Sequence, residues 1–270
     1  MDIASYLKRI AYNGPITPTA EALRNLHLAH LLTVPFENLS IHSGQPIILE
    51  DEALFDKIVT RRRGGFCYEL NGLFAALLRA LGFNVVMLSA GVAKADGGFS
   101  PDFDHMALLV TMQQRWLVDV GFGDSFRHPL VLDDRSEQKQ GDRVYRIVSE
   151  ENHFILRRRD SDEWKAQYRF TLQPYNYADY AGMCQYHQTS AESHFMSGRI
   201  CTLLTTQGRI TLSEMGLITT VDGGGRQERV PANEEEYASL LRTHFGIAQQ
   251  EPALKDNVRF ARDDDKNLSQ

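Results

Sequence analysis

The sequence has few cysteines, no long apolar run and no large excess of charge of one sign. Its 270 residues contain three cysteines, Cys67, Cys184 and Cys201. This number is small and odd, which argues against a disulfide framework. No pair has the CxxC spacing of a zinc site, and no further ligands show metal spacing around Cys67, so we expect no metal. Each cysteine is therefore judged by its own neighbourhood.

The apolar runs are far shorter than the roughly 20 residues that span a bilayer. The start, Met1-Asp2-Ile3, lacks the basic segment followed by an apolar segment that marks a secretory signal. The 29 Lys+Arg against 35 Asp+Glu give a net charge of -6 and no overall electrostatic footprint for a nucleic acid. We expect a cytoplasmic protein that binds neither a membrane nor a nucleic acid.

The hydrophobic period changes along the chain. Helical spacing dominates the start, and the clearest helix follows the motif RRRGGFCYELNG: apolar residues recur every three or four positions from Leu70 to Leu81, and Gly82 supplies a stop. Short strand patterns follow without helices between them, which is typical of an antiparallel sheet or barrel. A last helix is predicted between the N-cap Asn233 and Gly246. The expected strands cover residues 85–88, 106–110, 116–120, 144–148, 154–158, 164–172, 200–204, 210–212, 217–221 and 228–230.

Cys67 is the first candidate for chemistry. It follows Gly64-Gly65-Phe66 at a helix start, where free N–H groups and the positive end of the helix dipole favour a thiolate. The arginines at 61–63 are expected to act in the same direction. The alternative is a small buried apolar side chain, and sequence position alone leaves both open. Cys184 and Cys201 have no nearby base motif, so we expect them to be inert.

His105 and Asp119 are the candidate partners of this cysteine. His105 begins the apolar strand HMALLV, and Asp119 is a carboxylate inside the apolar strand WLVDVGFG, where it needs a hydrogen-bond donor. A hairpin with its turn centred at Met112 places the two residues opposite each other within one residue of register, at a Cβ separation of about 5 Å. The expected arrangement is a Cys-His-Asp triad, in which the carboxylate fixes the imidazole tautomer.

Five features resemble the arylamine N-acetyltransferases and together cover most of the chain. These are VPFENLSIH at 34–42, RRRGGFCYELNG at 61–72, a histidine 38 residues after the cysteine, VDVGFGD at 118–124 and SHFMSGRICTLLTTQG at 193–208. The resemblance implies an α+β fold with a papain-like Cys-His-Asp arrangement. Its implied parts are an N-terminal helical bundle with the nucleophile's helix (1–83), a central antiparallel β-barrel with an interdomain helix (84–190) and a C-terminal α/β lid (191–270).

The resemblance also implies an activity. An acetyl group passes from acetyl-CoA to the nitrogen of an arylamine or arylhydrazine by a ping-pong mechanism through an acetyl-cysteine, in xenobiotic metabolism. The implied catalytic residues are Cys67, His105 and Asp119. Phe36 and Phe122 map to the arylamine pocket, and Asp104 and Thr205 map to contacts with acetyl-CoA. The expected assembly is a monomer or a homodimer.

Other readings stay open. An amide synthase of the same family would use a longer acyl thioester, and a thiol hydrolase would use water. A binding protein would keep the fold with a dormant triad, but the presence of Cys67, His105 and Asp119 together argues against it. Glu37 and Arg63 are interpreted as a structural ion pair. Residues 157–159 are three arginines in a predicted strand, and alternation along the strand would divide their side chains between its two faces. We therefore interpret this segment as a solvated edge strand rather than as a site for CoA phosphates.

Overall fold

The structure, a computed structural model, describes residues 1–160 and 162–248. The remaining part of the predicted lid, 249–270, lies outside the described residues. Within the described part, no helix combines the length and the apolarity that crossing a bilayer requires. The division at residues 83 and 190 stays a prediction.

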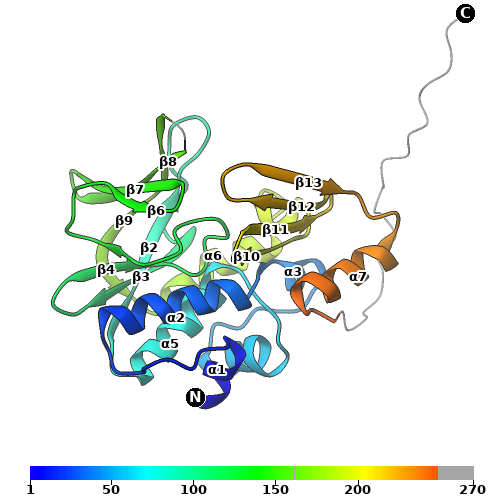
Figure 1. The fold of residues 1–270 in the computed structure, drawn as a ribbon, viewed down its shortest axis with the longest axis horizontal. Coiled ribbons are helices and arrows are strands. Elements are labelled where there is room, and N and C mark those ends of the chain that lie inside the picture. Colours follow the sequence, from blue (N-terminus) through cyan, green and yellow to red (C-terminus); the bar gives the residue numbers. More distant parts are fainter. Residues whose placement is uncertain (161, 249–270) are drawn as a thin grey trace, which may run out of the picture.

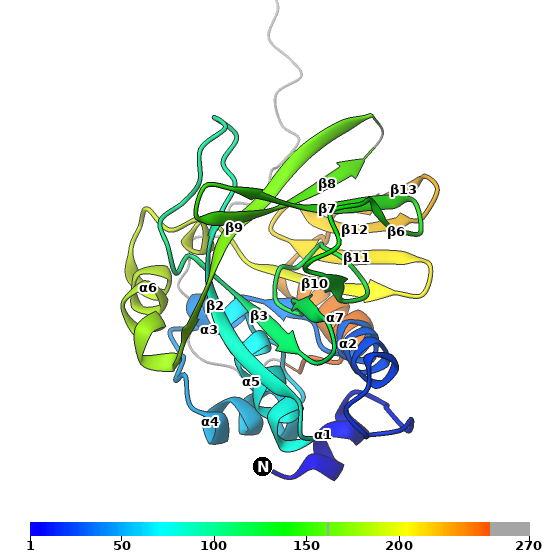
Figure 2. The same cartoon turned by 90° about the vertical axis from the view of Figure 1, so that its left-hand side faces the viewer.

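Helices make up most of the N-terminal part, as predicted. They are α1 (Ile3–Arg9), α2 (Ala20–Thr33), α3 (Leu39–His42), α4 (Asp51–Phe55), which continues as a π-helical turn over Asp56–Thr60, and α5 (Cys67–Ala80). Every residue of α5 from 67 to 78 is buried. Figures 1 and 2 show why: α5 lies beneath the sheets, with α2 beside it. The helix that begins at the candidate nucleophile therefore forms the middle of the core between the other helices and the barrel.

The middle of the chain is the predicted antiparallel barrel. Eight strands are paired in the order β5-β4-β3-β2-β9-β8-β7-β6. The two end strands are joined by a side chain, since Gln138 Oε1 accepts from the N–H of Val131 at 2.8 Å and its Nε2 donates to the Val131 carbonyl at 2.9 Å. The sheet is thus nearly closed. The strands are β2 (Asn84–Val92), β3 (His105–Thr111), β4 (Arg115–Val118), β5 (Leu130–Val131), β6 (Gln138–Gln140), β7 (Arg143–Glu150), β8 (His153–Asp160) and β9 (Glu163–Tyr175).

A second sheet stands beside the barrel and contains a strand from the N-terminal part (Figure 1). Its order is β1-β10-β11-β12-β13, and β1 pairs with β10 through Phe36 opposite Thr202. α7 packs on this sheet, begins after the N-cap Asn233 and ends at Gly246, as predicted. The remaining elements are β1 (Phe36–Glu37), α6 (Tyr177–Thr189), a 3₁₀ turn (His194–Met196), β10 (Ile200–Thr205), β11 (Gly208–Ser213), β12 (Gly216–Val221), β13 (Gly225–Arg229) and α7 (Glu234–Phe245).

β3 explains how one apolar run serves two cores. Met106 and Leu108 point to the cluster built around α5, whereas Ala107 and Leu109 point into the barrel. A strand buried on both faces reads as a continuous run rather than an alternation. This strand therefore carries His105, at its start, to the boundary between the helices and the barrel.

The predicted register of the β3–β4 hairpin is wrong by two residues, one more than the predicted margin. Leu108 lies opposite Val118, and continuing this register places Ala107, not His105, opposite Asp119. The turn is closed by a hydrogen bond from the Met112 N–H to the Gln114 carbonyl at 3.0 Å, so its centre lies one residue later than expected. His105 and Asp119 are consequently diagonal neighbours, which long side chains can still bridge.

The arginine triplet is not on an edge. β8 is paired with β7 on one side and with β9 on the other. Alternation does split the triplet, because Arg157 and Arg159 form ion pairs with Glu150 and Glu137 while Arg158 points to Asp124. The expectation of a solvated edge is therefore wrong.

Candidate active site

Just before Cys67, two backbone segments lie in close contact. The Gly65 carbonyl accepts a hydrogen bond from the Glu37 N–H at 2.9 Å, and a Cβ on Gly64 would lie 2.0 Å from the Pro35 carbonyl oxygen. Only glycine permits this contact. The segment before α5 is thereby fixed against β1, and Cys67 takes the first position of the helix.

Burial opposes ionisation of Cys67. The residue is 2% exposed, and burial raises the pKa of its thiol well above the usual range, with the nearby charges of Asp104 and Asp119 adding to the rise. A hydrogen bond from the Met106 backbone N–H works in the opposite direction. A thiolate at this position therefore depends on a cation beside it.

The arginines before the helix are engaged elsewhere. Arg61 forms an ion pair with Asp56 at 2.8 Å, and Arg63 forms a buried one with Glu37 at 2.8 Å, which is the structural pair predicted from the sequence. Each of these two positive charges is thus balanced by a carboxylate, which weakens the support that they were expected to give a thiolate at Cys67. His105 of the candidate triad lines the same cavity as Cys67 and is a further group that can carry positive charge there.

His105 and Asp119 form a buried pair. The Nε2–H of His105 donates to Asp119 Oδ2 at 2.8 Å, and the two side chains are 4% and 0% exposed. Burial would raise the pKa of Asp119, but His105 and hydrogen bonds from Asn71 Nδ2 and the Gly121 N–H hold it below its usual value. The carboxylate stays ionised and leaves Nδ1 of His105 as the nitrogen able to take a proton.

Asn71 is a site residue that the sequence reasoning missed. Its Nδ2 donates to Asp119 Oδ1 at 2.9 Å and to the Met106 carbonyl at 2.6 Å, and its Oδ1 accepts from the Val120 N–H at 2.9 Å. It lies one turn after Cys67 on α5 and is fully buried. A buried polar residue four positions after the nucleophile was the signal available, because such a side chain requires partners.

His27 is a second residue that was missed. This buried histidine of α2 places Nδ1 2.9 Å from the Arg127 carbonyl, while its Nε2 lies 3.0 Å from the Asp119 carbonyl and 3.4 Å from the Asp119 nitrogen. Burial lowers the pKa of His27 to about 4, so the ring is neutral. A neutral ring has one N–H, which donates to the carbonyl of either Arg127 or Asp119. His27 thereby contacts the backbone at both ends of residues 119–127, which we call the catalytic loop.

Cys67 and His105 open onto one cavity of about 510 Å³. The predicted substrate residues Phe36 and Phe122 both line it, and Phe122 meets the His105 ring edge-on with 5.1 Å between centroids. Val92, Phe195 and Ile200 add further apolar wall. A concave, mostly apolar site with a nucleophile and a base suits a flat aromatic ring.

Of the two residues expected to contact acetyl-CoA, the structure brings one to the cavity. Asp104 lines it, with Oδ1 3.1 Å from His187 Nε2. Burial of Asp104 is outweighed by hydrogen bonds from His187 and Ser100, which keep its pKa below the usual value. Thr205 is not among the lining residues; its hydroxyl accepts from the Gln207 N–H at the β10–β11 turn.

Sequence comparisons place this chain among well-described proteins. A family model described as N-acetyltransferase matches residues 19–253. An arylamine N-acetyltransferase / N-hydroxyarylamine O-acetyltransferase of Salmonella typhimurium is 34% identical over 247 residues, covering 90% of this chain and 88% of that protein. An arylamine N-acetyltransferase of Mycobacterium tuberculosis is 34% identical over 254 residues, covering 92% and 89%.

Solved structures are similar to this chain over nearly the same share of its length. The arylamine N-acetyltransferase of Mycobacterium marinum in complex with CoA superposes with a TM-score of 0.84 at 34% identity, covering 91% of this chain and 93% of that one. The Salmonella typhimurium arylamine N-acetyltransferase gives a TM-score of 0.84 at 31% identity, covering 91% and 90%. The similarity spans helices, barrel and second sheet together.

Proposed function

Because the chain belongs to the arylamine N-acetyltransferase family, and is thereby an acyltransferase, we propose that it moves an acetyl group from acetyl-CoA to the nitrogen of arylamines or arylhydrazines. The observation that carries this proposal is that Cys67 and His105 line one apolar cavity, while Asp119 accepts a hydrogen bond from His105. A thiol with a base and an aromatic pocket is the equipment that acyl transfer to an arylamine requires.

The first half-reaction forms an acetyl-cysteine. Nδ1 of His105 takes the thiol proton, and the resulting imidazolium, stabilised by Asp119, balances the Cys67 thiolate in its buried position. The sulfur attacks the thioester carbonyl, a new carbon–sulfur bond forms, and the bond to the CoA sulfur breaks. CoA leaves as the thiol after taking the proton from His105.

The second half-reaction uses the same two groups in the opposite order. An arylamine is uncharged at neutral pH, so its nitrogen can attack the acetyl-cysteine carbonyl without first losing an ammonium proton. His105 takes the proton released from the nitrogen and returns it to the Cys67 sulfur as the amide leaves. Phe36 and Phe122 are proposed to hold the aromatic ring during this step.

Acetyl-CoA is the proposed donor. The structural relative from Mycobacterium marinum is in complex with CoA, which supports a CoA thioester for this chain. Asp104, at the cavity, and Thr205, outside it, are the residues proposed from the family match to contact the donor.

The experiment is the intact mass of the protein after mixing with acetyl-CoA in the absence of amine, followed by peptide mapping. We expect one acetyl group on Cys67 and its discharge when an arylamine is added. No adduct and no CoA release would exclude acetyl-CoA and favour the longer thioesters of an amide synthase. CoA release that needs no amine would indicate a hydrolase.

Matched variants make this test specific. Cys67→Ala and His105→Ala are expected to abolish acetyl transfer, since one removes the nucleophile and the other its base. Cys184→Ala and Cys201→Ala should keep most of it, because burial raises the pKa of both thiols and neither lines the cavity. A fully active Cys67→Ala protein would refute the mechanism.

A further inference from the structure

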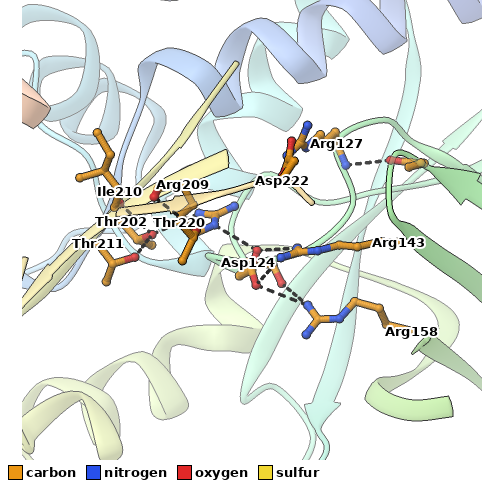
Figure 3. A network of polar contacts seen from close by, with 11 residues as sticks. Asp124, Arg127, Arg143, Arg158, Thr202, Arg209, Ile210, Thr211, Thr220 and Asp222 are labelled. Atoms are coloured by element: carbon orange, nitrogen blue, oxygen red, sulfur yellow. Dashed lines mark hydrogen bonds and ion pairs between the residues drawn. The ribbon is translucent and has the colours of Figure 1, made fainter. Parts of the chain in front are cut away.

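Three guanidinium groups converge on one carboxylate where the barrel meets the second sheet (Figure 3). Arg143 donates to both oxygens of Asp124, at 2.6 and 3.2 Å, and Arg209 Nε donates to Oδ1 at 3.0 Å. Arg158 donates to the Asp124 carbonyl at 3.0 Å. These arginines come from β7, β11 and β8, and we call them, with Asp124, the arginine cluster.

Around the arginine cluster, arginines outnumber carboxylates even if Arg158 is not counted. Arg127 pairs with Asp222 at 2.6 Å close by, so Arg127, Arg143 and Arg209 face the carboxylates of Asp124 and Asp222. Burial, and then the like charge of Arg143 and Arg127, lower the pKa of Arg209 against the opposing effect of Asp124. An added anion would relieve this repulsion.

The cluster lies directly behind one wall of the active-site cavity. Asp124 follows Phe122, which lines the cavity, by two residues. Arg209 Nη1 donates to the Thr202 hydroxyl at 3.2 Å, and Thr202 pairs with the cavity residue Phe36 across β10 and β1. The side chains of Asp124, Arg143 and Arg209 are 42%, 32% and 14% exposed, so solvent reaches the cluster mainly at Asp124 and Arg143.

We propose that the arginine cluster binds the phosphate groups of the acyl donor, an inference that rests on the proposed use of acetyl-CoA. Guanidinium groups bind phosphate oxygens through paired N–H donors, and several around one point suit a group with more than one negative charge. In acetyl-CoA the pantetheine arm separates the thioester from the diphosphate and the 3′-phosphate. The phosphates therefore bind outside the cavity when the thioester is at Cys67.

The test compares two donors that carry the same thioester, acetyl-CoA and S-acetylpantetheine, which has no phosphate. Arg143→Gln and Arg209→Gln are each expected to lower kcat/KM for acetyl-CoA by about tenfold or more, the effect of one charge-assisted contact. With S-acetylpantetheine both variants should stay within about twofold of the wild type. Full turnover with that donor also establishes that the variants fold.

Arg159→Gln is the matched control, because Arg159 is on β8 beside Arg158 but points away to Glu137. It should leave both donors unchanged. Equal losses with both donors in Arg143→Gln or Arg209→Gln would overturn the inference and assign the cluster to structure alone, and so would no loss with either donor. A wild type inactive with both donors would instead refute the proposed function.

Discussion

Asp119 accepts hydrogen bonds from three donors, and this number makes its replacement by asparagine informative. Asn71 and the Gly121 N–H both donate to Oδ1, while His105 donates to Oδ2. An asparagine oxygen can take the two bonds at Oδ1, but its NH₂ group then faces His105 Nε2. That nitrogen must become an acceptor, so the proton moves to Nδ1, where it blocks proton transfer from Cys67.

We therefore expect Asp119→Asn to fold and to lose acylation by about a thousandfold or more. The measurement is the rate of acetyl-Cys67 formation, together with a thermal unfolding curve. Asp133→Asn is the control, since Asp133 pairs with Arg115 at the surface and should react like the wild type. Acylation near the wild-type rate in Asp119→Asn would contradict the assigned tautomer.

At the same scale, the sequence singles out the three residues of the proposed triad more clearly than the residues that contact them. Cys67, His105 and Asp119 stand out because a helix start, a strand mouth and an apolar strand are unusual places for them. Asn71 and His27 do not stand out, since their roles depend on partners in other segments, Asp119 among them. A single polar residue in an apolar pattern indicates burial but does not name its partner.

At the scale of elements, the catalytic loop and α5 come unusually close at Gly121. A Cβ there would lie 2.7 Å from Asn71 Nδ2 and 2.8 Å from the Cys67 Cα. Gly121→Ala must therefore push the loop away from the helix and disturb Asp119, two residues earlier. We expect a loss of about 1 to 3 kcal/mol of stability and a disproportionate loss of acylation.

Gly182→Ala is the matched control, because a Cβ there meets nothing within 4 Å on the exposed face of α6. It should gain about 0.5 to 1 kcal/mol from helix propensity and keep its activity. Urea unfolding and acylation rates of both variants check these outcomes. Wild-type acylation in Gly121→Ala would show that the close contact does not position the loop.

Helices and strands are predictable from the sequence where the hydrophobic periodicity is strong, and their ends are less predictable. The helix from Cys67 and the strands at 106–110 and 144–148 follow the hydrophobic pattern. Register depends on the turn, and the Met112 to Gln114 hydrogen bond moves the centre by one residue. The two-residue strands β1 and β5 carry no period, since they exist only through their partners.

At the scale of the whole molecule, the second sheet takes one of its strands from the N-terminal part. The predicted parts are contiguous in sequence, but β1 forms one edge of the second sheet. Pairing between segments more than 160 residues apart follows from packing, not from a local pattern. The fold class is therefore predictable from the order of elements, whereas their association is not.

Asn38 links the N-terminal part to residues 195–200 through three side-chain hydrogen bonds. Its Nδ2 donates to the carbonyls of Phe195 and Gly198 at 3.0 and 2.9 Å, and its Oδ1 accepts from the Ile200 N–H at 2.8 Å. The side chain is buried, so Asn38→Ala leaves these backbone groups without their partner. We expect a loss of about 2 to 4 kcal/mol of stability.

The location of the two tryptophans makes this variant a test of cooperativity. Trp116 and Trp164 both belong to barrel strands, and Trp116 packs in the core around α5, so their fluorescence reports the barrel and its contact with the helices rather than the second sheet. If the parts unfold as one unit, Asn38→Ala lowers the urea midpoint by fluorescence and by far-UV circular dichroism equally, while the exposed Asn84→Ala moves neither. A circular dichroism curve that splits, with the fluorescence midpoint unchanged, would instead mean that the second sheet unfolds independently of the barrel.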